Sequence, residues 1–137
     1  MKTAFIFPGQ GAQYIGMATD FLEHDIELKS ILQEFDRVHQ TPLEKTMIEG
    51  PEELLKQTHL TQPAILFHSI CALQYFQKEF KITPDFVAGH SLGEFSALVA
   101  SGVLSLNDAM HIVHKRGEFM IRASLRSVSI MAACRRA

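Results

Sequence analysis

Ser91 is the residue of this chain whose surroundings best suit a nucleophile. It is the centre of Gly89-His90-Ser91-Leu92-Gly93, a Gly-x-Ser-x-Gly pattern whose glycines allow a sharp strand-to-helix turn that exposes the hydroxyl. An apolar run, 86–88, precedes the pattern and a helix-forming run, 92–100, follows it, so we expect a strand, the serine and then a helix. The Leu92 N–H would lie at the helix N-terminus, where it can stabilise an oxyanion.

A polar loop near the N-terminus is the second candidate. Pro8–Gln13 follows Thr3–Phe7, an apolar run typical of a buried strand. Loops after the carboxyl ends of parallel strands gather at one edge of the sheet, so Gln10 could meet Ser91 and help to complete an oxyanion hole. A dinucleotide-binding Gly-x-Gly-x-x-Gly loop is disfavoured, because Tyr14 stands where the last glycine would be. Considered alone, the loop is better explained as a flexible turn with solvated amides.

Arg116 is the third candidate. It lies in Asn107–Met120, a segment whose apolar residues recur at helical spacing, and Ser105-x-x-Asp108 resembles a capping box that begins the helix. An arginine far along a helix ordinarily complements the helix dipole and reaches water. In the presence of the other two motifs, its planar guanidinium is instead predicted to bind a substrate carboxylate through two parallel hydrogen bonds.

Four motifs in this order resemble those of the malonyl-CoA:acyl-carrier-protein transacylases. The motifs are Phe5–Gln13, Thr61–Ala64, Gly89–Leu98 and Arg116–Met120. The resemblance implies that Ser91 is the acylated nucleophile, that Arg116 binds the malonyl carboxylate, and that Gln10 and the Leu92 N–H surround the oxyanion. Such enzymes transfer the malonyl group of malonyl-CoA through a serine-linked acyl-enzyme to the phosphopantetheine thiol of acyl carrier protein, in fatty acid biosynthesis.

The same resemblance implies the fold and its organisation. We expect an α/β fold with a parallel sheet and the serine elbow, which is the α/β-hydrolase-like large subdomain of the acyltransferase fold, incomplete at the C-terminus. Residues 1–125 are assigned to that subdomain. Residues 126–137 are either the start of a small ferredoxin-like subdomain, with a strand at Ile130–Ala133, or an unrelated tail. No cofactor is implied, because the coenzyme A thioester is the substrate.

The family's general-base histidine comes from later sequence, so we expect it to be absent and the chain to be truncated and impaired. His90 receives a supporting role only, since sequence neighbours on a turn usually diverge. His68 is predicted to be a core histidine, while His111 and His114 share a helix face with too few ligands for a metal site. The remaining histidines are expected at the surface: His24, His39 and His59.

Hydrophobic spacing predicts the elements between the motifs. A long helix is expected from Pro63 to Phe80, and one or two amphipathic helices from Glu23 to Val38 with a break near His24-Asp25. Strands at Thr3–Phe7 and Phe86–Gly89, separated by helices, favour a parallel sheet.

Composition restricts the class of protein further. The chain has 137 residues, of which 47% are hydrophobic and 20% charged, and its net charge is -2, which indicates about one domain and no basic stripe for nucleic acid. No run is long enough to span a membrane, and the residues before Pro8 are too few for a signal peptide. Cys71 and Cys134 lack metal or redox spacing. We therefore expect reduced thiols and a cytoplasmic location.

Two other classes of function remain open. A serine esterase or thioesterase of the α/β-hydrolase type would share the elbow, but it has no need of a buried arginine. A non-catalytic fragment would be consistent with the missing base. Arg116 and the Pro8–Gln13 loop favour the transacylase, whereas the preference between malonyl and branched acyl groups is left undecided.

Overall fold

The computed structural model describes residues 2–126. The expected strand at Ile130–Ala133 and Cys134 lie outside the described residues, as does all of the expected second part except Arg126. The elements follow in the order β1 (Ala4–Phe7), α1 (Thr19–His24), α2 (Ile26–His39), α3 (Leu43–Glu49), α4 (Glu52–Leu55), α5 (Thr58–Phe80), β2 (Phe86–Gly89), α6 (Leu92–Ala100) and α7 (Leu106–Arg126).

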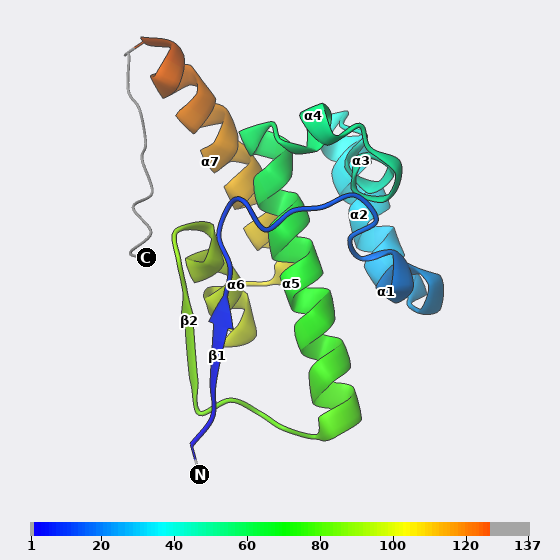
Figure 1. Ribbon diagram of the computed structural model, residues 1–137, viewed down its shortest axis with the longest axis vertical. Coiled ribbons are helices and arrows are strands. Elements are labelled where there is room, and N and C mark those ends of the chain that lie inside the picture. Colours follow the sequence, from blue (N-terminus) through cyan, green and yellow to red (C-terminus); the bar gives the residue numbers. More distant parts are fainter. Residues whose placement is uncertain (1, 127–137) are drawn as a thin grey trace, which may run out of the picture.

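The two strands pair in parallel, as the sequence predicts. Ala4 lies opposite Phe86 and Phe7 opposite Gly89, so both strands end at the same level. The loop after Phe7 and the turn after Gly89 therefore leave the same edge of the sheet (Figure 1). Side chains from β1, α5 and α6 form a small apolar cluster beside the sheet: Phe7, Ile70, Leu73 and Ala97.

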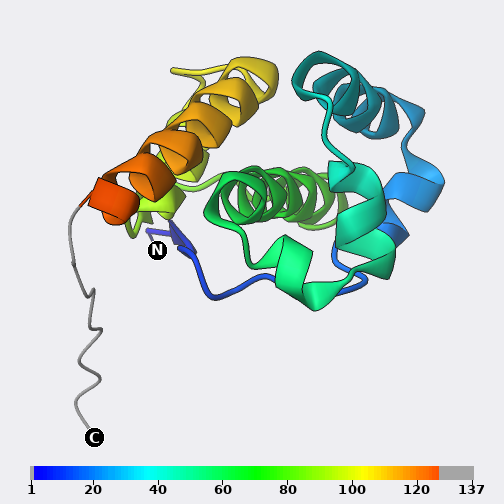
Figure 2. The same ribbon diagram turned by 90° about the horizontal axis from the view of Figure 1, so that it is seen from above.

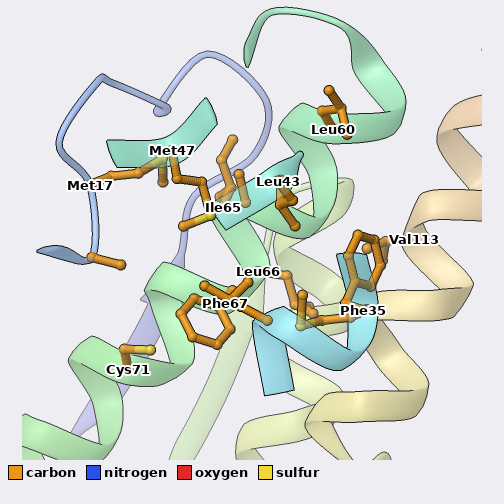
Figure 3. Packing of buried hydrophobic residues seen from close by; sticks show 14 of the residues in the cluster. Met17, Phe35, Leu43, Met47, Leu60, Ile65, Leu66, Phe67, Cys71 and Val113 are labelled. Atoms are coloured by element: carbon orange, nitrogen blue, oxygen red, sulfur yellow. The ribbon is translucent and has the colours of Figure 1, made fainter. Parts of the chain in front are cut away.

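Helix α5 is the centre of the larger core. Seen from above, it runs between α7 on one side and α2 and α3 on the other (Figure 2). Phe35 of α2, Leu66 of α5 and Val113 of α7 have no exposed surface and meet in this core (Figure 3). Burial on both sides of α5 explains its nearly continuous apolar sequence from Ala64 to Leu73.

Two predicted helix boundaries are confirmed by capping contacts. Asp25 separates α1 from α2, and its Oδ1 accepts the N–H groups of Glu27 and Leu28, both at 3.0 Å. Ser105 precedes α7, and its Oγ accepts the Asp108 N–H at 3.0 Å. Both contacts satisfy N–H groups that have no partner inside the helix. Helix α7 runs six residues beyond the predicted end at Met120, to Arg126, since no glycine or proline interrupts that segment.

The predicted start of the long helix at Pro63 is wrong. Helix α5 begins at Thr58, and Pro63 lies inside it. Proline ordinarily disrupts a helix interior because it removes one backbone hydrogen bond, here the bond to the carbonyl of His59. That carbonyl has a partner from another helix, since it lies 2.8 Å from Nδ1 of His114.

Candidate active site

Ser91 occupies the strained turn that its sequence pattern predicts. Its backbone has φ 54° and ψ −102°, a conformation that costs free energy for any residue except glycine. The flanking glycines are needed for close packing: a Cβ built on Gly89 would lie 1.9 Å from the Gly93 carbonyl carbon, and one on Gly93 would lie 2.3 Å from the Phe7 carbonyl oxygen. The strained conformation of Ser91 persists because this close backbone packing restricts the path of the chain on both sides of it. Ser91 itself is exposed.

The structure places Arg116 next to Ser91. Its Nη2 donates to the Ser91 Oγ at 2.9 Å, although the two residues are 25 positions apart in sequence. Its Nη1 donates to Gln62 Oε1 at 2.8 Å, and its Cζ lies 5.7 Å from the centre of the Phe95 ring. The guanidinium is thus held between α5 and α6 rather than directed into solvent. This position suits a cation that binds a group attached to the serine.

Gln62 is a residue of the site to which the sequence analysis assigned no role. Its side chain lies in α5 with 0% of its surface exposed. Besides accepting from Arg116, it donates from Nε2 to the Met120 Sδ at 3.3 Å. A buried amide is retained when its hydrogen bonds are made, so Gln62 is a support for the Arg116 guanidinium. The signal in the sequence is a lone amide directly before Pro63 and a long apolar run.

The two residues expected to stabilise the oxyanion, Leu92 and Gln10, differ in whether their donors already have an acceptor. Leu92 is the first residue of α6 and is buried, and among the described residues no acceptor takes its N–H. The Gln10 side chain points to α5, where its Nε2 donates to Thr58 Oγ1 at 3.3 Å. The loop that carries Gln10 nevertheless meets the elbow, because a Cβ built on Gly9 would lie 2.8 Å from the His90 carbonyl oxygen. The role of Gln10 at the oxyanion stays a prediction.

No imidazole hydrogen-bonds to Ser91 among residues 2–126. The His90 ring lies back against the N-terminal loop, with Nδ1 3.2 Å from a Cβ built on Gly9. This orientation is consistent with packing between the elbow and the loop, and the supporting role of His90 stays a prediction.

Two histidines expected at the surface instead join a cluster between α2, α5 and α7. His39 Nε2 lies 2.6 Å from His111 Nδ1, and the rings of His39 and His59 contact the ring of His114, with centroids 4.2 Å and 5.5 Å away. Sequence spacing could not show these contacts, because the three helices are far apart along the chain. Burial, together with the charges of neighbouring His114, His111 and Lys115, lowers the pKa of His39 to about 4.

His68 is half-buried rather than enclosed in the core. Its ring contacts Tyr14 and Phe21, and its Nδ1 has no hydrogen-bond partner. Burial lowers its pKa. In the part of the chain that the structure describes, no three or more histidine, cysteine or acidic side chains are grouped so as to hold a metal ion, and no helix is both long and apolar enough to cross a membrane.

Comparison with known proteins connects this geometry to one family. A family model described as acyl transferase domain matches residues 4–134. The malonyl CoA-acyl carrier protein transacylase of Bacillus subtilis is 50% identical over 132 residues, which are 96% of this chain and 41% of that protein. The chain therefore spans about two fifths of the length of the curated relatives it matches.

Solved structures agree with the sequence comparison. An acyl carrier protein S-malonyltransferase from Vibrio cholerae is 40% identical, with a TM-score of 0.79 over 90% of this chain and 40% of that one. A second structure is a type II PKS acyl-carrier protein in complex with its malonyl-transacylase, which is 37% identical, with a TM-score of 0.79 over 90% of this chain and 40% of that chain. The α/β acyltransferase fold expected from the sequence is thereby confirmed for the described part.

Proposed function

Since the chain belongs to the acyl transferase domain family, we propose that it transfers a malonyl group from coenzyme A to the phosphopantetheine thiol of acyl carrier protein. The observation that carries the proposal is the Arg116 guanidinium, 2.9 Å from the Ser91 hydroxyl. A malonyl ester on Ser91 ends in a free carboxylate, and a guanidinium at this distance can bind it through two hydrogen bonds. An esterase or thioesterase has no comparable need of a cation beside its serine.

The proposed reaction has two steps at one serine. The Ser91 Oγ attacks the thioester carbonyl of malonyl-CoA, the C–S bond breaks, and the serine proton passes to the departing thiolate. The sulfur of the carrier-protein thiol then attacks the ester carbonyl, the C–O bond to Ser91 breaks, and the thiol proton passes to the Ser91 Oγ, which restores the hydroxyl. The Leu92 N–H, at the positive end of α6, is suited to stabilise the oxyanion of each step, with the Gln10 backbone N–H as the second donor.

Arg116 exchanges partners during this cycle. In the structure it donates to Ser91 Oγ, which has no other hydrogen-bond partner among the described residues. After acylation, that N–H is free to donate to the malonyl carboxylate. The bond from Arg116 to Gln62 does not involve Ser91, so we expect it to persist, to hold the guanidinium in place and to leave little ordering for when the substrate binds.

The remaining features of the proposal follow from the family. Acyl carrier protein is proposed as the partner because a solved relative is a complex with such a protein. We propose no cofactor, since the thioester supplies the activated acyl group, and we propose a cytoplasmic location. We further propose that residues 1–125 belong to the large subdomain and that a general-base histidine is not provided by this chain.

Mass spectrometry after incubation with malonyl-CoA tests the proposal. We expect one malonyl group on Ser91, formed slowly because the described residues place no base beside the hydroxyl. Ser91→Ala abolishes the label, whereas the matched control Ser101→Ala, an exposed serine just after α6, retains it. A chain that takes up no malonyl group, or a label that persists in Ser91→Ala, contradicts the proposal.

A further inference from the structure

The proline inside α5 leaves a backbone carbonyl that its own helix cannot satisfy. Pro63 has no N–H, and its i−4 partner in an α-helix is the carbonyl of His59. A carbonyl that is partly withdrawn from water and has no donor costs free energy. The donor comes from α7, where His114 Nδ1 lies 2.8 Å from that oxygen.

His114 is built into the interface between the two helices. Only 3% of its surface is exposed, and its ring packs between those of His39, His59 and Phe35. Burial lowers the pKa of His114, while the bond to the His59 carbonyl and the nearby Glu118, whose Oε1 lies 3.6 Å from Nε2, act in the opposite direction. The contact with the His59 carbonyl then assigns the proton to Nδ1, since a carbonyl oxygen only accepts.

The backbones of α5 and α7 approach closely beside this bond. Gly117, one turn after His114, faces the start of α5, and a Cβ built on it would lie 2.5 Å from the His59 Cα. Two contacts thus fix the position of His59 relative to α7. One is the hydrogen bond from His114, and the other is the close approach of Gly117, which leaves no room for a side chain at residue 117.

The site residues are attached to the same two helices at this point. Gln62 lies one turn after His59 on α5, and Arg116 lies two residues after His114 on α7. The bond from Arg116 Nη1 to Gln62 Oε1, at 2.8 Å, crosses the same interface. A shift of α5 along α7 that broke the His114 contact would therefore displace Gln62 from the guanidinium.

We propose that His114 is a positioning residue, whose hydrogen bond to the carbonyl left open by Pro63 holds α5 and α7 in the register that places Arg116 beside Ser91. The catalytic part of this inference rests on the proposed malonyl transfer, because it makes His114 a determinant of carboxylate binding. The hydrogen bond and its dependence on Pro63 do not rest on that function.

A double-mutant cycle tests the bond without any assay of activity. His114→Leu removes the donor, and we expect it to raise the unfolding equilibrium constant roughly ten- to a hundred-fold, because the partly buried carbonyl loses its partner. Pro63→Ala restores a backbone N–H at residue 63. In the Pro63→Ala background, the rise in the unfolding equilibrium constant caused by His114→Leu is expected to be about ten times smaller than in the unaltered chain. Equal effects of His114→Leu in the two backgrounds would overturn the inference, whether or not malonyl transfer is detected.

Kinetics test the positioning role. For His114→Leu we expect the KM for malonyl-CoA to rise roughly tenfold while acetyl transfer changes little, because only malonate uses the guanidinium. His114→Asn places an amide N–H near the position of Nδ1 and is expected to restore most of the malonyl preference. The matched control His111→Leu, on the same helix but bonded to His39 of α2, leaves that preference unchanged.

The outcomes separate the two proposals. If His114→Leu lowers malonyl and acetyl transfer equally, or if His114→Asn restores stability without restoring the malonyl preference, His114 has a structural role alone and the inference fails. If the unaltered chain forms no acyl-enzyme, the proposed function fails, while the double-mutant cycle still decides the bond between His114 and His59. The ¹⁵N shifts of the His114 ring provide a direct check, since a proton on Nε2 instead of Nδ1 would also refute it.

Discussion

Replacement of Arg116 by alanine should weaken malonyl transfer far more than acetyl transfer. The two acyl groups differ by one carboxylate, and Arg116 is the cation whose Nη2 lies 2.9 Å from the Ser91 Oγ to which either group would be attached. In Arg116→Ala the malonyl carboxylate would approach a site without a donor. An acetyl group makes no use of that donor, so its transfer serves as the internal reference.

The magnitude follows from the contacts of the guanidinium. Hydrogen bonds to a charged group contribute about 1.5–3 kcal/mol, and each 1.4 kcal/mol is a factor of about ten in an equilibrium constant. We therefore expect the ratio of malonyl to acetyl transfer to fall by roughly ten- to a hundred-fold. Because Gln62 and Phe95 already hold Arg116 in place, little of this free energy is spent on ordering the side chain when malonate binds.

The assay is kcat/KM for malonyl-CoA and acetyl-CoA with the same preparation of each variant. Arg116→Lys keeps the charge but cannot form the bidentate hydrogen bonds of a guanidinium. Its ratio of malonyl to acetyl transfer should therefore lie between those of the unaltered protein and Arg116→Ala. Lys115→Ala is the control, since this neighbouring cation is exposed and pairs with Glu118 at 2.7 Å. Equal losses of malonyl and acetyl transfer in Arg116→Ala would refute the reasoning and leave Arg116 a structural residue.

Two further predictions concern stability. Phe35→Ala should lower the free energy of unfolding by about 3–5 kcal/mol, because Phe35 has 0% of its surface exposed. In the same urea titrations, replacement of the exposed Phe80 by alanine should change that free energy by less than about 1 kcal/mol. Similar losses for both variants would contradict this account of the core. The pKa of His39 is lowered from its ordinary value of 6.5 to about 4, so the unfolded chain binds the extra proton first and stability should fall as the pH drops from about 6.5 towards 4. In His39→Gln that decline should be shallower, and an unchanged slope would show that His39 does not contribute to it.

Local patterns in the sequence predict much of the fold because they depend on near neighbours. The pairs of glycines around Ser91 predict the elbow, since the turn is made within five residues. Asp25 and Ser105 mark helix starts because a capping contact spans only three residues. The exception is Pro63, whose local effect is to end or begin a helix; a donor from 51 positions later in the chain, His114, makes it acceptable in the interior.

The contacts that make the site depend on how the helices pack. The residue types of Ser91 and Arg116 indicate a nucleophile and a carboxylate-binding cation. The distance of 2.9 Å between Ser91 Oγ and Arg116 Nη2, however, arises because α6 and α7 pack beside α5. The support from Gln62 and the histidine cluster around His114 join segments more than 50 residues apart. Sequence periodicity can tell which face of a helix is apolar, but it carries no information on the register of one helix against another. That register is set by close packing and interhelix hydrogen bonds, which exist only in the folded chain.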